Sequence, residues 1–213
     1  GRPGRGRRAI SSASGPRNSS MTPKVARRAY LDTNVLIEYA WERTPSAPAS
    51  RQNLASRLVE LGLDGRFDMY VSVFCIMELY EHFRDWFLLQ KVIGDGFGYR
   101  EFRRERKRHR LSKQEAAILE SLVAEFRDNP NIYFVEFESV PVDFFSRVAI
   151  LQRHGIDCMD AFHLLTALDV GATHFVTKDG EVRSRFDKVT RKELVSPPMK
   201  MTSMRGFWKG LRS

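Results

Sequence analysis

The sequence has little cysteine, no long apolar run and no acidic residue among its first thirty positions. Its 213 residues include only two cysteines, Cys75 and Cys158, and neither belongs to a CxxC or Cys/His pattern. Both lie in apolar segments, so we expect reduced core thiols, which favours a cytosolic protein over a disulfide-stabilised secreted one. Because no apolar run approaches the ~20 residues of a membrane span, we expect no transmembrane helix and no membrane partner.

The remaining composition predicts one globular domain with basic ends. Hydrophobic residues make up 42% and charged residues 29% of the chain, whose length suffices for one core. Residues 1–24 are basic and rich in Gly, Ser and Pro, so we expect a disordered extension, and Met21 as an alternative start would make it non-native. A domain over residues 25–195 and a basic tail over 196–213 complete the predicted organisation.

The net charge of +9 is unevenly distributed. Residues 1–30 carry eight Lys/Arg and no acid, residues 178–213 carry ten against four, and the centre is net acidic. Within that centre, residues 100–110 hold seven basic residues against two acids. An acidic centre beside basic segments suits a protein that holds a metal and grips a polyanion, although basic tails that only add solubility are the alternative.

Short apolar segments alternate with amphipathic ones from residue 25 onward. This pattern predicts an α/β fold, a parallel central sheet flanked by helices, with a basic helical insertion near residues 87–111. Ser112 and Glu115 form a capping box at one helix start. The predicted strands are 29–31, 68–74, 132–137 and 173–176, and the predicted helices are 33–41, 50–63, 76–89, 113–126, 142–154 and 157–169.

Four acids follow apolar stretches, and only one of them has a basic neighbour in the sequence. In a parallel sheet the ligand site lies beyond the carboxyl ends of the strands, where two of these acids are expected. The other two are expected in the first turns of helices. Unpaired carboxylates are costly to bury, so we expect the four to converge on Mg²⁺ or Mn²⁺, which prefer hard oxygen ligands. The four are Asp32, Glu78, Asp160 and Asp179.

Several neighbouring residues have two interpretations. Asp157 precedes Asp160 by three residues, which suits a helix N-cap, and a supporting or ligand role is the alternative. Asp179 is either a ligand or a turn residue before Gly180. Glu81 lies one helical turn after Glu78 and is able to replace it. His163 is expected to pack or to form a hydrogen bond, because imidazole is a poor ligand for Mg²⁺.

Four segments together resemble the PIN-domain nucleases and, within them, the VapC-like toxin nucleases. They are 30–37, 71–79, 160–167 and 175–179, and the resemblance covers residues 28 to about 185. It implies a parallel sheet, a Mg²⁺- or Mn²⁺-bound acidic cluster and cleavage of RNA phosphodiester bonds. Toxin members pair with an antitoxin and are commonly homodimers. Matched residue by residue, the resemblance implies Asp32, Glu78, Asp160 and Asp179 as catalytic metal ligands, supported by Thr33, Asn34 and Thr177.

The basic segment 100–110 is longer and more basic than the helical connection in compact toxins. We expect it to bind RNA phosphates, with Phe102 and His109 available for stacking; a solvated face or an antitoxin contact is the alternative. The sequence thus predicts a metal-dependent endoribonuclease, the toxin of a type II toxin-antitoxin pair. A non-catalytic nucleic-acid-binding or scaffold protein and a housekeeping RNA-processing nuclease are the rivals. The predicted RNA-binding residues are Arg100, Arg103, Arg104, Arg106, Lys107, Arg108 and Arg110.

Overall fold

A parallel sheet forms the centre of the protein. The computed structural model describes residues 27–43, 53–136, 141–189, 191–194 and 198–212, so the predicted extension over residues 1–24 lies outside the described part. All strand pairs of the sheet are parallel, and the strand order is β3-β2-β1-β4-β5. The predicted α/β class is therefore confirmed. The strands are β1 (Arg28–Leu31), β2 (Asp68–Ser72), β3 (Ile132–Val135), β4 (His174–Val176) and β5 (Lys200–Thr202).

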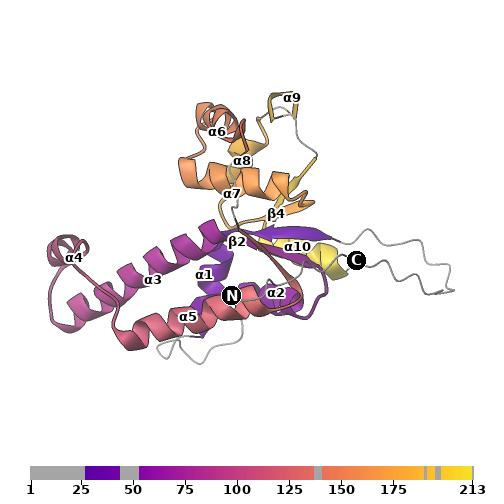
Figure 1. Ribbon diagram of the computed structural model, residues 1–213. Coiled ribbons are helices and arrows are strands. Elements are labelled where there is room, and N and C mark those ends of the chain that lie inside the picture. Colours follow the sequence, from indigo (N-terminus) through magenta and orange to yellow (C-terminus); the bar gives the residue numbers. More distant parts are fainter. Residues whose placement is uncertain (1–26, 44–52, 137–140, 190, 195–197, 213) are drawn as a thin grey trace, which may run out of the picture.

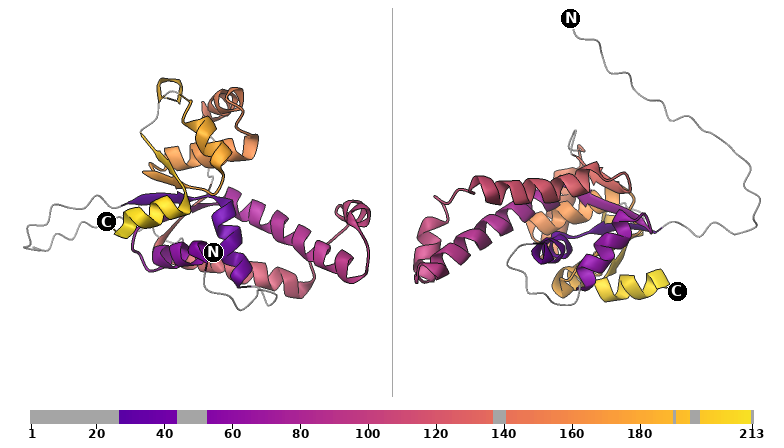
Figure 2. Two further views of the ribbon diagram at one scale, coloured as in Figure 1. Left: turned by 180° about the vertical axis from the view of Figure 1, so that it is seen from behind. Right: turned by 90° about the horizontal axis from the view of Figure 1, so that it is seen from below.

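Helices cover both faces of the sheet. Figure 1 shows α6 to α9 on one side and α1, α2, α5 and α10 on the other, and the reverse view in Figure 2 agrees. The helices are α1 (Thr33–Glu42), α2 (Leu54–Leu63), α3 (Val73–Gly94), α4 (Tyr99–Glu105), α5 (Lys113–Asp128), α6 (Phe144–Arg153), α7 (Cys158–Asp169), α8 (Gly180–Phe186), α9 (Arg191–Leu194) and α10 (Met204–Arg212). None of these helices is both long enough and apolar enough to cross a bilayer.

The central strand β1 is apolar because both of its faces are covered. Ala29, Tyr30 and Leu31 are fully buried, as expected for a strand in the middle of a parallel sheet. The ring of Tyr30 stacks on that of Phe175 in the neighbouring β4, with centroids 5.4 Å apart. This packing holds the carboxyl end of β1, and therefore the acid that follows it, in a defined position.

The basic insertion projects away from the sheet. Helix α3 runs outward to Gly94, five residues beyond its predicted end, α4 lies at the tip, and α5 returns toward the sheet (Figure 1). The predicted capping box starts α5: the Ser112 hydroxyl accepts from the Glu115 amide, and the Glu115 carboxylate accepts from the Ser112 amide. The expected basic helical insertion is thus an arm built from α3, α4 and the start of α5.

Three features differ from the sequence-based expectations. Cys75 is buried, but Cys158 is exposed at the first position of α7, so only the former is a core thiol. Strand β2 ends at Ser72 and α3 begins at once, which places Glu78 in the second turn of that helix rather than the first. Part of the predicted basic tail belongs to the fold, because β5 pairs with β4 and Phe207 of α10 is buried.

Candidate active site

Asp32 lies at the carboxyl end of the central strand. The register of β1 and β4 aligns Leu31 with Val176, so that Asp32 and Thr177 emerge side by side. The Asp32 amide donates to the Val176 carbonyl at 3.0 Å and extends this pairing by one residue. The side chain of Asp32 is only 6% exposed and also caps α1. The buried acid thus sits where the predicted ligand site of a parallel sheet is found.

Three neighbouring groups orient the carboxylate of Asp32. Its Oδ1 accepts from the Thr33 amide at 2.8 Å, and its Oδ2 accepts from Asn34 Nδ2 and Thr177 Oγ1, both at 2.6 Å. Burial raises the pKa of Asp32, while the charge of His163 and the Thr177 hydrogen bond lower it. The structure therefore places Asn34 and Thr177 as groups that orient this carboxylate.

Glu78 is held by two side chains from different parts of the fold. Its Oε2 accepts from Thr33 Oγ1 at 2.5 Å and from His163 Nε2 at 2.8 Å. Burial would raise the pKa of Glu78, but these two hydrogen bonds outweigh it and the pKa is lowered. Both bonds use Oε2, and no hydrogen bond reaches Oε1 from the described residues. One oxygen of an ionised Glu78 is thus left for a ligand.

His163 connects Glu78 to a buried polar network. The ring is 1% exposed, and its Nδ1 lies 2.8 Å from Tyr30 Oη. Burial disfavours the charged ring, but Cys75 and Glu78 outweigh this effect and raise the pKa of His163 to about 11. The predicted hydrogen bond of His163 is present. Its partner, Glu78, is 85 positions away and had no signal in the sequence.

Asp160 lies in the first turn of α7 among other carboxylates. Burial raises the pKa of Asp160 to about 7, assisted by the negative charges of Asp157, Asp32 and Asp179. Asp32, Glu78 and Asp160 line one open cavity of about 640 Å³. The structure therefore brings three of the four predicted ligands around one space. The raised pKa of Asp160 reflects burial first and repulsion by neighbouring carboxylates second.

Asp179 adopts a different position. Its Oδ1 accepts from the amides of Glu181 and Val182, at 2.7 and 3.0 Å, and so caps α8. It does not line the cavity, although its charge acts on Asp160. A capping carboxylate retains lone pairs for a cation, so the cap and the predicted ligand role are compatible. The hydrogen bonds of Asp179 in the structure are those of a helix cap.

Asp157 is the N-cap of α7. Its Oδ1 accepts from the Asp160 amide at 2.9 Å, as the three-residue spacing predicted. We expect Asp157→Ala to lower the free energy of unfolding by about 1 kcal/mol, the usual cost of losing a cap. Asp157→Asn keeps the cap and should leave stability nearly unchanged. Urea denaturation of both variants with EDTA measures this difference; equal losses would show that charge, rather than capping, is what Asp157 contributes.

The oxygen donors that line the cavity are of the kind that a hard divalent cation prefers, but their side chains are not arranged around a common point. Among the described residues, no group of three or more Asp, Glu, His or Cys side chains is arranged to hold a metal ion. The chemistry of the site nevertheless matches such an ion, because carboxylate oxygens are its preferred ligands. Burial, together with repulsion by neighbouring carboxylates, raises the pKa of Asp160 to about 7, and a bound cation would offset both effects. Asp32, Glu78 and Asp160 would hold it, with Asp179 nearby.

The seven predicted RNA-binding residues lie on the arm, and one of them reaches the acidic cavity. Arg106 lines this cavity together with Glu81, and its guanidinium forms an ion pair with Asp85 at 2.5 Å. Arg104 is paired with Glu105. The sequence indicated neither the pairing of Arg106 with Asp85 nor its place beside the acids, because 21 residues separate the two partners. No ion pair within the described residues involves Arg100, Arg103, Lys107, Arg108 or Arg110.

Comparison with known proteins identifies the family. The profile of the PIN domain family matches residues 29–192, a range that contains all four predicted acidic ligands and the arm. Among curated proteins, none matches the sequence. PIN domains are generally nucleases that use divalent metal ions. Because the match spans well over half of the sequence, the chain belongs to the PIN domain family.

Proposed function

We propose that this protein is a metal-dependent endoribonuclease that hydrolyses RNA phosphodiester bonds with Mg²⁺ or Mn²⁺. The observation that carries the proposal is the cavity lined by Asp32, Glu78 and Asp160, in which the pKa of Asp160 is raised to about 7 by burial and by other carboxylates. A cluster of acids that repel one another at the carboxyl edge of a parallel sheet is a costly arrangement without a cation. Family membership adds the nuclease chemistry.

The residues around the cavity have distinct roles: some orient the carboxylates and others keep them ionised. Asn34 and Thr177 orient Asp32, and His163 and Thr33 hold Glu78 ionised. A divalent cation bound there supplies a water of lowered pKa and neutralises charge on a non-bridging phosphate oxygen. The protein's own contribution is a fixed set of oxygen donors and a cavity open to a polyanion.

Metal-dependent cleavage is the direct test. Purified protein is incubated with a mixture of unstructured RNAs and Mn²⁺, with and without EDTA, and the 5′ ends of the products are determined. We expect internal cleavage that EDTA abolishes and products with 5′-phosphate and 3′-hydroxyl ends. Asp160→Asn protein prepared in parallel controls for contaminating ribonucleases. RNA binding without cleavage at any divalent ion would instead support a non-catalytic binding protein.

We propose the more specific role of a toxin in a type II toxin-antitoxin pair from the resemblance to VapC-like toxins. It adds a cognate antitoxin and a homodimer as partners. The long α3 and the α4 tip depart from the compact connection of such toxins and favour the second candidate, a housekeeping RNA-processing nuclease. Expression in a bacterial host without any partner separates the two. Growth arrest that requires Asp160 supports the toxin, and unimpaired growth supports RNA processing.

A further inference from the structure

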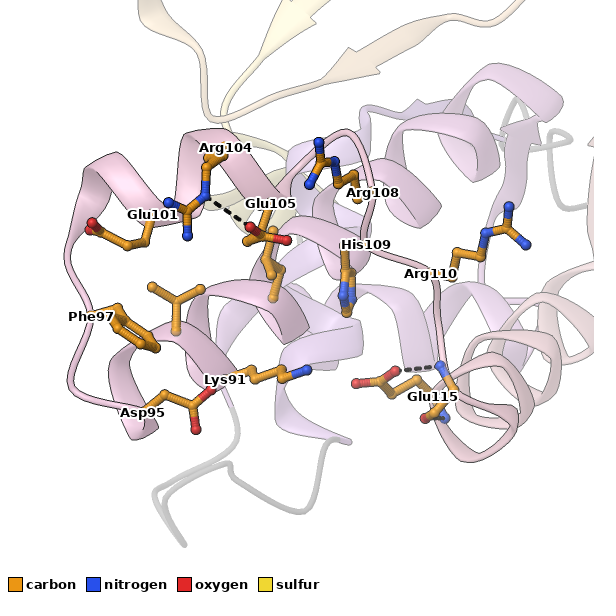
Figure 3. A pocket seen from close by; sticks show the side chains of 13 residues that line it. Lys91, Asp95, Phe97, Glu101, Arg104, Glu105, Arg108, His109, Arg110 and Glu115 are labelled. Atoms are coloured by element: carbon orange, nitrogen blue, oxygen red, sulfur yellow. Dashed lines mark hydrogen bonds and ion pairs between the residues drawn. The ribbon is translucent and has the colours of Figure 1, made fainter.

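Two cavities along the described part of the arm differ in charge. Figure 3 shows the first, of about 580 Å³, where Arg104 lies beside Glu105 and the Glu115 carboxylate is used in the capping box. Its four basic lining residues are balanced by four acidic ones. The second cavity, of about 670 Å³, is lined by four basic residues and by one acid, Glu81. Only the second cavity therefore has the charge to attract phosphate.

The second cavity adjoins the acidic one. Glu81 and Arg106 line both of them. The two acids of α3 along this path are compensated, since Arg84 pairs with Glu81 at 2.6 Å and Arg106 pairs with Asp85 at 2.5 Å. A polyanion leaving the acidic cavity in this direction therefore meets neutralised carboxylates first. It then meets Arg103 and Lys107, which form no ion pair with any residue that the structure describes.

The same cavity is lined by an exposed aromatic residue, Tyr99, and by a half-buried one, Phe102. Tyr99 is 70% exposed, and its ring stacks on that of Phe102 with centroids 6.0 Å apart and planes 20° apart. A large aromatic ring held in place with one face free is a platform for an unstacked base. His109 also lines this cavity, and its Nε2 is buried without a hydrogen-bond partner in the described part of the chain.

We propose that Tyr99, Arg103 and Lys107 form a subsite for single-stranded RNA next to the cleaved bond, with a base stacked on Tyr99 and phosphates held by the two cations. The inference rests on the proposed ribonuclease function, which it extends to the path of the substrate. Stacking accepts any base, so the subsite selects single-stranded RNA without selecting a sequence. A duplex, whose bases are already stacked, has nothing to place on the ring.

Binding without metal tests the subsite apart from cleavage. The affinity of full-length protein for a short unstructured RNA is measured in EDTA by fluorescence anisotropy, and a 2-aminopurine base in the same RNA reports stacking. We expect Tyr99→Ala to weaken binding on the order of tenfold and to remove 2-aminopurine quenching, whereas Tyr99→Phe, which keeps the ring, retains both. An RNA duplex should show no dependence on Tyr99.

Phe97→Ala is the matched control. Phe97 is 57% exposed on the same arm but lines the first, charge-balanced cavity, so its loss should leave RNA affinity unchanged. Equal losses for Phe97→Ala and Tyr99→Ala, or no loss for either, would overturn the subsite. So would an acidic peptide of matched charge that binds as tightly as the RNA with the same dependence on Tyr99, because it would mark a protein-docking surface.

The two proposals fail in different ways. Cleavage by the wild-type protein with RNA affinity insensitive to Tyr99 overturns the subsite and leaves the ribonuclease standing. Absence of cleavage together with Tyr99-dependent stacking supports the subsite and removes the catalytic function.

Discussion

Replacing Asp160 with asparagine is expected to reduce Mn²⁺-dependent RNA cleavage by about a thousandfold while leaving the fold intact. The substitution removes one negative charge from the cavity shared with Asp32 and Glu78 but almost no volume. Charge stabilisation by a bound metal contributes several kcal/mol to such a reaction, which corresponds to about three orders of magnitude in rate. Single-turnover cleavage at saturating Mn²⁺ measures the loss. Retained cleavage would exclude Asp160 as an essential ligand.

The metal-free Asp160→Asn protein should be more stable than wild type at alkaline pH. The pKa of Asp160 is raised to about 7, mainly by burial and by Asp157, from an unfolded value near ~3.9. The folded protein therefore holds a proton that the unfolded chain has lost between about pH 4 and 7, and this stability disappears as the pH rises through 7. After discounting for solvent screening, we expect the variant to gain about 1 to 2 kcal/mol at about pH 8.

Denaturation with EDTA across this pH range tests the sign. Wild type should lose stability between about pH 4 and 7, where the unfolded chain has released the proton that folded Asp160 still holds, and Asp160→Asn should not. Added Mn²⁺ should reverse the order by stabilising wild type more strongly. Asp157→Asn is the matched control, because it removes a like charge beside Asp160 but keeps the cap of α7 and all three cavity acids. The Asp157→Asn control should still cleave RNA. If instead Asp160→Asn melts well below wild type, Asp160 has a structural role.

The sheet and the positions of Asp32 and Asp157 were predictable because their signals are local. Apolar runs that end in an acid predict a buried parallel strand and the residue just beyond its carboxyl end, as found for Asp32 after β1. The role of Asp157 followed from a three-residue spacing to the amide that it caps. Such features depend on neighbours in the sequence, so no knowledge of the tertiary structure was needed.

The remaining features depend on contacts between distant residues. The hydrogen bond between His163 and Glu78 joins α7 to α3, and nothing in either segment of the sequence indicates that the two helices meet. The three-residue β5 begins with a basic residue and was predicted to be part of a basic tail. Only its pairing with β4 makes it a strand. For Asp179, the choice between cap and ligand depends on one side-chain orientation, which sequence pattern does not specify.

The basic residues of the arm show the same limit. Their number predicted a phosphate-binding segment, but not that they line two cavities of different charge. Arg103 and Lys107 line the cavity that adjoins the acids, whereas Arg104 and Arg108 line the charge-balanced one. Charge content alone treats these four residues as equivalent. The structure makes them two pairs with equal charge and different surroundings.

These two pairs provide the last prediction. Each phosphate contact on a single strand contributes roughly −0.7 to the slope of log affinity against log salt concentration. The double variant Arg103→Gln with Lys107→Gln should therefore flatten the slope by about 1.4 units. If wild type and variant bind equally at about 1 M salt, the variant should bind RNA on the order of 25-fold more weakly at about 0.1 M salt. Arg104→Gln with Arg108→Gln removes the same charge from the other cavity and should change the slope little.

Anisotropy titrations over a range of salt concentrations, in EDTA, measure both slopes on unrelated RNA sequences. An equal Mn²⁺-induced rise in Tm for wild type and both variants confirms that the acidic cavity is untouched. If both double variants flatten the slope equally, the arm acts through its overall field rather than through one face. If neither does, the basic run is a solvated surface or a protein contact, since a residue that touches phosphate must release counterions when it binds.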